Sequence, residues 1–158
     1  MIKFCKYAWD QNESKLRKAL KDSEPDFLRM CSYKDLVHLI VKNIFNNGQD
    51  RLNRIWDAEK ITVIDDGDYQ GTLLFTIPED TYQPGPHQYL MTYVDYGSCS
   101  GCDTLLNVQM YIPYEGDVPD SSINDFLTLC RDIVANTVCP FNNGWRKEDI
   151  FNPAEDDE

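Results

Sequence analysis

Residues 61–77, ITVIDDGDYQGTLLFTI, decide the fold of this chain. Two apolar runs rich in β-branched side chains, 61–64 and 71–77, flank the turn-forming sequence DDGDYQ, and this pattern is typical of a β-hairpin. Residues 89–95 (YLMTYVD) predict a third strand, and the intervening loop 78–88 is too long for a tight turn. We therefore expect a small antiparallel sheet of about three strands.

Before the hairpin the pattern is helical. The segment 11–22 follows a capping-box spacing that begins at Asp10, and it should end before Pro25 because the residue ahead of a proline is pushed out of the α region. The segment 34–46 places its apolar side chains on one face, and Gly48 beyond it is a typical stop signal. Two helices are therefore predicted on the N-terminal side of the sheet.

After the third strand, one further helix is predicted over 122–138. It follows another capping-box spacing at 121–125, carries an amphipathic stripe and should end at Pro140. No internal repeat or linker divides the chain. The predicted fold class is α+β, in which the small antiparallel sheet packs with helices near 11–22, 34–46 and 122–138.

Length and composition indicate one domain. A chain of 158 residues can bury roughly two thirds of the surface that it exposes when unfolded, so one core over 1–154 suffices. The acidic segment 155–158 (EDDE) is typical of a solvated tail. The longest apolar stretches are far shorter than the roughly 20 residues that span a bilayer, and the N-terminus lacks the features of a secretory signal. We expect a cytoplasmic location and no membrane partner.

The charge is distributed unevenly along the chain. The net charge of −12 combines +3 over residues 1–60 with −15 over residues 61–158, and no Lys or Arg lies between Ile61 and Cys130. One interpretation is a solvated surface that favours solubility; the other is an acidic face that steers a basic partner. The residues assigned to partner binding on this face are Asp65, Asp66, Asp68, Glu79, Asp80, Asp117 and Asp120.

The most distinctive segment is 96–105, YGSCSGCDTL, which follows a strand and contains a CxxC pair, Cys99 and Cys102. On the structural interpretation, its two glycines, Gly97 and Gly101, allow a tight turn while the small Ser and Cys side chains let the backbone pack closely against the core. Without an export signal the cysteines should stay mostly reduced. We interpret three of them as core thiols: Cys5, Cys31 and Cys130.

Two chemical interpretations of the CxxC pair stay open. A redox site between a strand and a helix is a familiar arrangement, because a helix N-terminus lowers the pKa of the first thiol. Against it, the βαβ context of a thioredoxin-like domain is missing and Asp103 would oppose thiolate formation. A zinc site would take half of its tetrahedral ligand set from Cys99 and Cys102. The other half would have to come from Cys130, Cys139, Cys5, Cys31, His38 or His87.

Signatures of an enzyme are few in this sequence. Residues 65–68 (DDGD) resemble part of a calcium loop, but Thr76 stands where an EF-hand has its glutamate, so a hairpin turn explains them better. No P-loop, GxGxxG, GxSxG or HExxH motif occurs. We interpret His38 as a boundary residue of its helix, and nothing places it or His87 beside a nucleophile. A non-enzymatic protein is therefore the prediction.

The strings IDDGDYQGTLLFTIP (64–78) and YLMTYVDYGSCSGCDTLLNVQ (89–109) carry a resemblance. They resemble a group of uncharacterised proteins, associated with bacteriophages and other mobile elements, that carry the YGSCSGCDTL motif. The resemblance covers roughly the middle third of the chain and extends more weakly around 129–132. It implies a small accessory protein in a prokaryotic or phage-infected host cytoplasm, and it implies no catalytic or binding residue.

These observations lead to two hypotheses of function. The leading one is a non-enzymatic inhibitor or adaptor that binds a basic host protein, for example a nucleic-acid-handling defence protein, through an acidic face and without direct contact to nucleic acid. The alternative is a zinc-binding or thiol-redox protein centred on Cys99 and Cys102. Apart from that zinc, no cofactor is expected.

Overall fold

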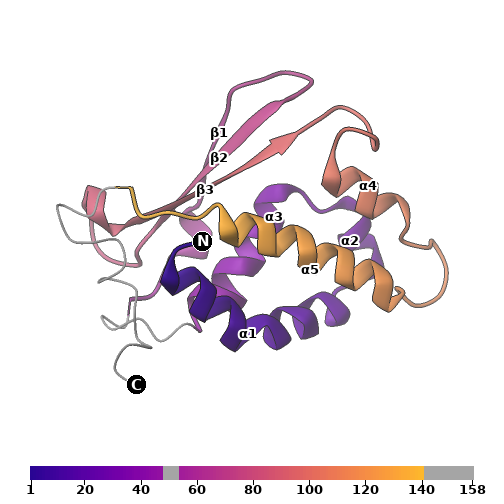
Figure 1. Cartoon of the computed structure of the whole chain (residues 1–158), viewed down its shortest axis with the longest axis horizontal. Helices are drawn as coiled ribbons and strands as arrows, with labels where there is room; N and C mark the ends of the chain where they lie inside the picture. Colours follow the sequence, from indigo (N-terminus) through magenta and orange to yellow (C-terminus); the bar gives the residue numbers. More distant parts are fainter. Residues whose placement is uncertain (48–53, 141–158) are drawn as a thin grey trace.

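The computed structural model describes residues 1–47 and 54–140, in which helices cover one face of a three-stranded antiparallel sheet (Figure 1). The strands are β1 (Thr62–Asp65), β2 (Gly71–Pro78) and β3 (Tyr89–Tyr96). They lie in the order β1-β2-β3, so β1 is an edge strand of this sheet. The predicted hairpin over 61–77 and strand over 89–95 are confirmed, and so is the α+β fold class.

Side chains alternate between the two faces of the sheet, because successive residues of a strand point in opposite directions. The face toward the helices carries Phe75, Ile77 and Leu90, which are fully buried. The opposite face carries Ile64 and Tyr93, whose side chains are about half exposed. The hydrophobic core therefore lies between the sheet and the helices, and the outer face of the sheet is open within the described part of the chain.

The first helix, α1 (Lys3–Asp22), is longer than predicted. The prediction of a helix over 11–22 with a cap at Asp10 was wrong at its start, since Asp10 lies inside α1 and pairs with Lys6 at 2.7 Å. Buried side chains at helical spacing, from Phe4 onward, extend the apolar stripe by two turns and outweigh the local capping signal. The helix ends before Pro25, as predicted.

The predicted helix over 34–46 is confirmed with a different last turn. It consists of α3 (Tyr33–Ile40), which begins at a capping box between Ser32 and Asp35, and a π-helical turn over Val41–Phe45. The amide of Asn12 from α1 donates to the carbonyl oxygen of Ile44 at 3.3 Å. Because this amide is buried, the hydrogen bond satisfies it and ties α1 to the π turn.

The third predicted helix is displaced. The structure has α5 (Asp120–Ala135) where 122–138 was predicted. Pro119 precedes the helix without a side-chain cap, so the capping-box spacing at 121–125 predicted the wrong start. Beyond the helix, the backbone of Val138 exchanges two hydrogen bonds of 2.8 Å with Met91 of β3. The chain thus leaves the helix before Pro140 because its last apolar residues extend the sheet.

Two short helices were not predicted. They are α2 (Pro25–Met30) and α4 (Thr104–Met110), and single 3-10 turns also occur at Ala58–Lys60 and Pro86–Gln88. Pro25 occupies the first turn of α2, where a proline is well tolerated, and Asp103 caps α4. Each is too short to show a hydrophobic period, so neither could be recognised from apolar spacing alone.

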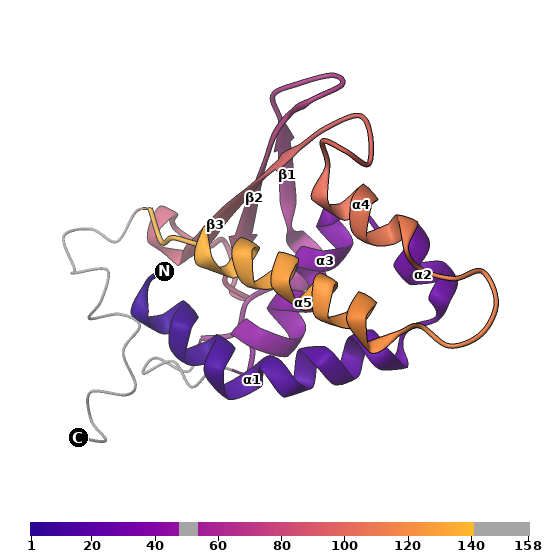
Figure 2. The same cartoon turned by 45° about the vertical axis from the view of Figure 1, so that its right-hand side comes forward.

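The buried side chains form one cluster beneath the sheet, where α1 and α5 lie side by side (Figure 2). Cys5, Cys31 and Cys130 belong to this core, as predicted, and Cys139 is buried as well. Burial raises the pKa of the Cys31 thiol to about 11. Among the described residues no helix has the length and apolar character needed to cross a bilayer. The predicted tail 155–158 lies outside the described residues.

Asn12→Ala should lower the free energy of unfolding by about 2 kcal/mol, because it removes the buried hydrogen bonds from this amide to the carbonyl oxygens of Ala8 and Ile44. Gln11→Ala, one position earlier and exposed, is the matched control and should change stability by less than about 0.5 kcal/mol. Urea unfolding at pH 7 measures both. Equal effects of the two substitutions would show that the Asn12 contact does not stabilise the π turn.

Candidate functional site

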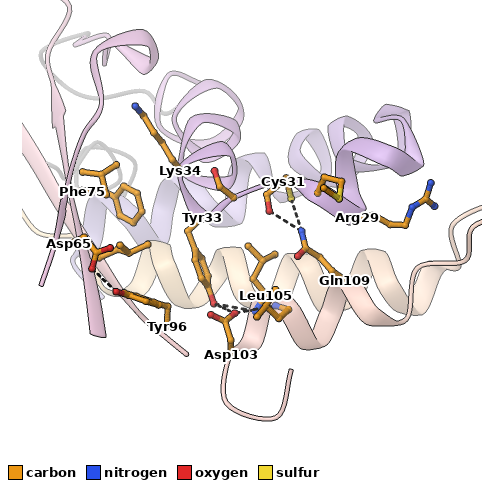
Figure 3. A pocket seen from close by; sticks show the side chains of 15 residues that line it. Arg29, Cys31, Tyr33, Lys34, Asp65, Phe75, Tyr96, Asp103, Leu105 and Gln109 are labelled. Carbon is orange, nitrogen blue, oxygen red and sulfur yellow. Dashed lines mark hydrogen bonds between the residues drawn. The ribbon is translucent and has the colours of Figure 1, made fainter. Parts of the chain in front are cut away.

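A groove of about 540 Å³ opens between the sheet, the junction of α2 with α3, and α4 (Figure 3). Its apolar lining comes from Val63, Leu73, Phe75, Leu105 and Leu106. Three strands and three helices contribute residues to it, so it exists only in the folded chain. A cavity of this size with an apolar lining is typical of a site that accepts apolar groups of a ligand or partner.

Hydrogen bonds between α4 and the helices beside it hold one wall of the groove. The Tyr33 hydroxyl donates to the Asp103 carboxylate at 2.8 Å and accepts from the backbone N–H of Leu105 at 3.1 Å. The amide of Gln109 donates to the carbonyl oxygens of Leu28 and Cys31, at 3.0 and 2.8 Å. These contacts fix α4 beside α2 and α3 and keep the groove open toward the sheet (Figure 3).

The β1–β2 connection forms an acidic end to this groove. We define the hairpin tip by four carboxylates, which are Asp65, Asp66, Asp68 and Asp95. Asp65 also lines the groove, accepts from the Tyr96 hydroxyl at 2.6 Å and accepts from the backbone N–H of Gly67 at 3.0 Å. Tyr96 and Asp65 lie on strands β3 and β1, so their hydrogen bond crosses β2, in which Gly71 pairs with Tyr96.

The same contacts shift two pKa values in opposite directions. The hydrogen bond from Tyr96, and then that from Gly67, lower the pKa of Asp65 below its ordinary value. The hydrogen bond to Asp65 raises the pKa of Tyr96 to about 12, and the charges of Asp66 and Asp68 add to this effect. The Asp65 carboxylate is therefore ionised and held in one position at neutral pH.

Two cations, Arg29 and Lys34, are among the residues that line the groove. Arg29 is occupied, since it pairs with Asp26, donates to the carbonyl oxygen of Pro113 at 2.6 Å and lies over the ring of Tyr114. Lys34 is exposed at the rim. Of these two cations, Lys34 makes no ion pair with a described residue, whereas Arg29 is paired with Asp26.

The structure divides the predicted partner-binding residues among three places. Asp65, Asp66 and Asp68 share the hairpin tip. Glu79 and Asp80 follow the other end of β2, and its eight residues separate the two groups by roughly 24 Å. Asp117 and Asp120 lie at the connection from α4 to α5, on another side of the molecule (Figure 1), and Asp120 is 3.4 Å from Lys21. The seven carboxylates therefore do not form one continuous face.

The CxxC segment forms an exposed turn, which we call the cysteine turn (residues 97–103). The Cys99 Sγ lies 2.7 Å from the Cys102 Sγ, and the backbone N–H of Cys99 donates to the Cys102 Sγ at 3.1 Å. These contacts, with that between the two sulfurs the largest cause, lower the pKa of Cys102. Both cysteine side chains of this turn are exposed.

Of the two glycines of the cysteine turn, one is required by close packing. A Cβ at Gly97 would lie 2.6 Å from the carbonyl oxygen and 2.7 Å from the Sγ of Cys102. A Cβ at Gly101 would meet only the Cys99 Sγ, at 3.9 Å, which is an ordinary contact. The turn is therefore built around Gly97, as the structural interpretation requires, whereas Gly101 is dispensable for it.

Within residues 1–47 and 54–140, no group of three or more His, Cys, Asp or Glu side chains is placed to hold a metal ion. The zinc hypothesis therefore has two ligands, Cys99 and Cys102, in the described part of the chain. The other candidates are engaged elsewhere: His38 lies 2.9 Å from the Glu59 carboxylate, and the remaining four cysteines are buried. His87 lies exposed on a 3-10 turn.

Sequence reasoning missed the network around Asp103, which was considered only as a charge beside the thiols. Asp103 is buried and accepts from the backbone N–H groups of Gly97 and Leu106 in addition to the Tyr33 hydroxyl. The available signal was an Asp followed by apolar residues at helical spacing, which is typical of a helix N-cap. No local pattern pointed to Tyr33, which is seventy positions away in sequence.

The fold and the groove define a small α+β protein with an open, apolar groove beside an acidic hairpin. No protein-family model, curated protein or solved structure matches this chain significantly.

Tyr96→Phe should raise the pKa of Asp65 toward its ordinary value of 3.8, because it removes the largest cause of the shift. Since the folded pKa is lowered, this carboxylate stabilises the fold fully above pH 3.8 and loses that contribution as pH falls through the lowered value. An NMR titration of the Asp65 carboxyl carbon measures the change. Tyr93→Phe, on the outer face of the sheet, is the control, and an unchanged Asp65 pKa in Tyr96→Phe would contradict the assignment.

Proposed function

We propose that this chain is a non-enzymatic binding protein that takes a basic segment of a partner protein at the hairpin tip and in the adjoining groove. The observation that carries the proposal is the position of Asp65, which belongs both to the hairpin tip and to the lining of the apolar groove. A charged site and an apolar site are thereby continuous. A partner segment with a Lys or Arg next to an apolar side chain matches both.

The hairpin tip is available for such a partner. Its four carboxylates, Asp65, Asp66, Asp68 and Asp95, make no ion pair with any described residue. No Lys or Arg lies between Ile61 and Cys130, and the cations of the described ranges are on the helices and their connections. Complementary charge on a partner would therefore meet an unneutralised surface, and such surfaces accelerate encounter.

The distances narrow the original hypothesis of one acidic face. Glu79 and Asp80 lie about three Debye lengths from the hairpin tip, because that length is about 8 Å at physiological ionic strength. Among the acidic groups, we therefore assign direct contact with the partner only to the hairpin tip. The groups at Glu79 and Asp80, and at Asp117 and Asp120, contribute to the net negative potential but not to the same contact.

The resemblance to bacteriophage and mobile-element proteins suggests where the partner is found. Proteins that handle nucleic acids present basic surfaces to phosphate groups, and an acidic protein can occupy such a surface. A basic host protein, such as a nucleic-acid-handling defence protein, is therefore the partner to search for first. On this proposal the chain inhibits or adapts that protein by occupying its basic surface.

Neutralising the hairpin tip should slow association with the partner. The triple variant Asp65→Asn, Asp66→Asn, Asp68→Asn should lower the on-rate about tenfold at low salt and change the off-rate less, because encounter depends on the net field near the contact. The matched control Glu79→Gln, Asp80→Asn, Asp117→Asn removes the same charge elsewhere. Surface-plasmon kinetics at several salt concentrations, with the partner captured from host lysate, measure both. Equal slowing by the two variants would show that the overall negative field, and not the hairpin tip, steers the encounter, and no slowing by either would leave the charge as a solubility device.

Filling the groove should weaken the complex in a different way. Leu106→Trp places a large side chain in the groove lining and should raise the off-rate, whereas Met110→Trp lies on the same helix outside the lining and should not. Replacing Cys99 and Cys102 by serine should leave both rates unchanged, because neither residue lines the groove. If Leu106→Trp binds as the parent does, the groove is not part of the contact.

A further inference from the structure

We propose that Cys99 and Cys102 form a thiol–disulfide exchange site that reduces a disulfide of another molecule, with Cys102 attacking and Cys99 completing the exchange. The two sulfur atoms are 2.7 Å apart in the cysteine turn and both side chains are exposed. A disulfide bond joins sulfurs about 2.0 Å apart, so little movement is needed to close one. This site is separate from the proposed partner contact, since neither cysteine lines the groove.

Exposure distinguishes this pair from every other cysteine of the chain. Cys5, Cys31, Cys130 and Cys139 are buried, and burial raises the pKa of the first three well above the ordinary value. A thiol reacts as its thiolate, so buried thiols with raised pKa values are inert. Of six cysteines, only Cys99 and Cys102 combine access to solvent with a neighbouring sulfur.

The geometry assigns the attacking role to Cys102. Its Sγ accepts from the backbone N–H of Cys99 at 3.1 Å, and such a hydrogen bond favours a negative sulfur. The pKa of Cys102 is lowered, first by the contact with the Cys99 side chain and then by backbone donors in the same turn. The objection that Asp103 opposes the thiolate is weakened, because its carboxylate is occupied by donors from Gly97, Tyr33 and Leu106.

The exchange balances with a disulfide of general form RSSR as oxidant. The Cys102 thiolate attacks one sulfur of RSSR, which forms a mixed disulfide and releases RS⁻, and that group takes up a proton as RSH. The Cys99 thiol then loses its proton and attacks the Cys102 Sγ, which forms the Cys99–Cys102 bond and releases the second RSH. Two hydrogens and two electrons leave the protein, and RSSR is reduced to two RSH.

The cysteine turn preorganises the second step. Gly97 lets the backbone approach the Cys102 Sγ, and Asp103 anchors the turn to α4 and Tyr33. A resolving thiol held beside its target reacts with a high effective concentration, whereas the same residues in a flexible peptide spend little time at that separation. The folded chain should therefore close the disulfide more readily than the free sequence 96–103.

Exchange with oxidised glutathione tests the proposal directly. The reduced protein is equilibrated in glutathione buffers, quenched with acid, alkylated and cleaved after Asp95 and Asp103, which isolates fragment 96–103 with both cysteines. The fragment should have lost two hydrogens and taken up no alkyl group, and disulfide closure should be favoured at least about tenfold over the synthetic peptide 96–103. Closure no better than in the peptide would overturn the proposal, and so would accumulation of a stable mixed disulfide with glutathione.

Single variants test the assignment of roles. Cys99→Ser should form a stable mixed disulfide with glutathione at Cys102, and Cys102→Ser should react at least about tenfold more slowly through Cys99. Equal or reversed rates overturn the assignment of the attacking thiol. Gly97→Ala should lower the equilibrium constant for closing the Cys99–Cys102 disulfide toward that of the peptide, because the added Cβ displaces the Cys102 Sγ. Gly101→Ala should keep the equilibrium constant of the parent protein. If both glycine variants keep the parent value, the turn does not preorganise the pair.

Discussion

The buried carboxylate of Asp103 is the interaction on which the rest of this structure depends. Taking a carboxylate out of water costs several kcal/mol unless hydrogen bonds replace its hydration. Here three donors do so, from the residue after β3 (Gly97), from α4 (Leu106) and from α3 (Tyr33). Because Tyr33 also accepts from Leu105, these elements are fixed to one another. One side chain thus sets the wall of the groove and the base of the cysteine turn.

This arrangement decides which residues can separate the two proposed activities. A substitution at Asp103 or Tyr33 alters the groove wall and the cysteine turn together, so a loss of function there identifies neither site. Leu106 and Gly97 lie on opposite sides of the shared network, one in the groove lining and the other against the Cys102 Sγ. Substitutions at Leu106 and Gly97 therefore act independently as long as the hydrogen bonds of Asp103 are kept.

The parts of the fold that could be predicted are those in which one local signal is strong. The hairpin has two apolar strands around a turn, and the helix at 34–46 has a clear apolar face, so both were found. The start of α1 was missed because burial of Phe4 outweighed the capping signal at Asp10, and the end of α5 was missed because the Val138 bridge to Met91 ends the helix before Pro140. The groove could not be predicted at all, since its walls come from segments far apart in sequence. Charge counts likewise give the number of carboxylates but not their separation.

The hairpin tip differs from a merely solvated acidic surface because three of its four carboxylates, those of Asp65, Asp66 and Asp95, are held in place by hydrogen bonds. Asp66 accepts from the backbone N–H of Thr72 at 2.6 Å, and Asp95 accepts from the Thr72 hydroxyl at 2.7 Å, in addition to the contacts of Asp65. An ionised carboxylate has about four acceptor positions, so each of these groups keeps capacity for a partner donor. A side chain already ordered loses less entropy on binding than a mobile one. The hairpin, rather than the net charge of −12, therefore supplies the fixed pattern that a Lys or Arg of a partner can recognise.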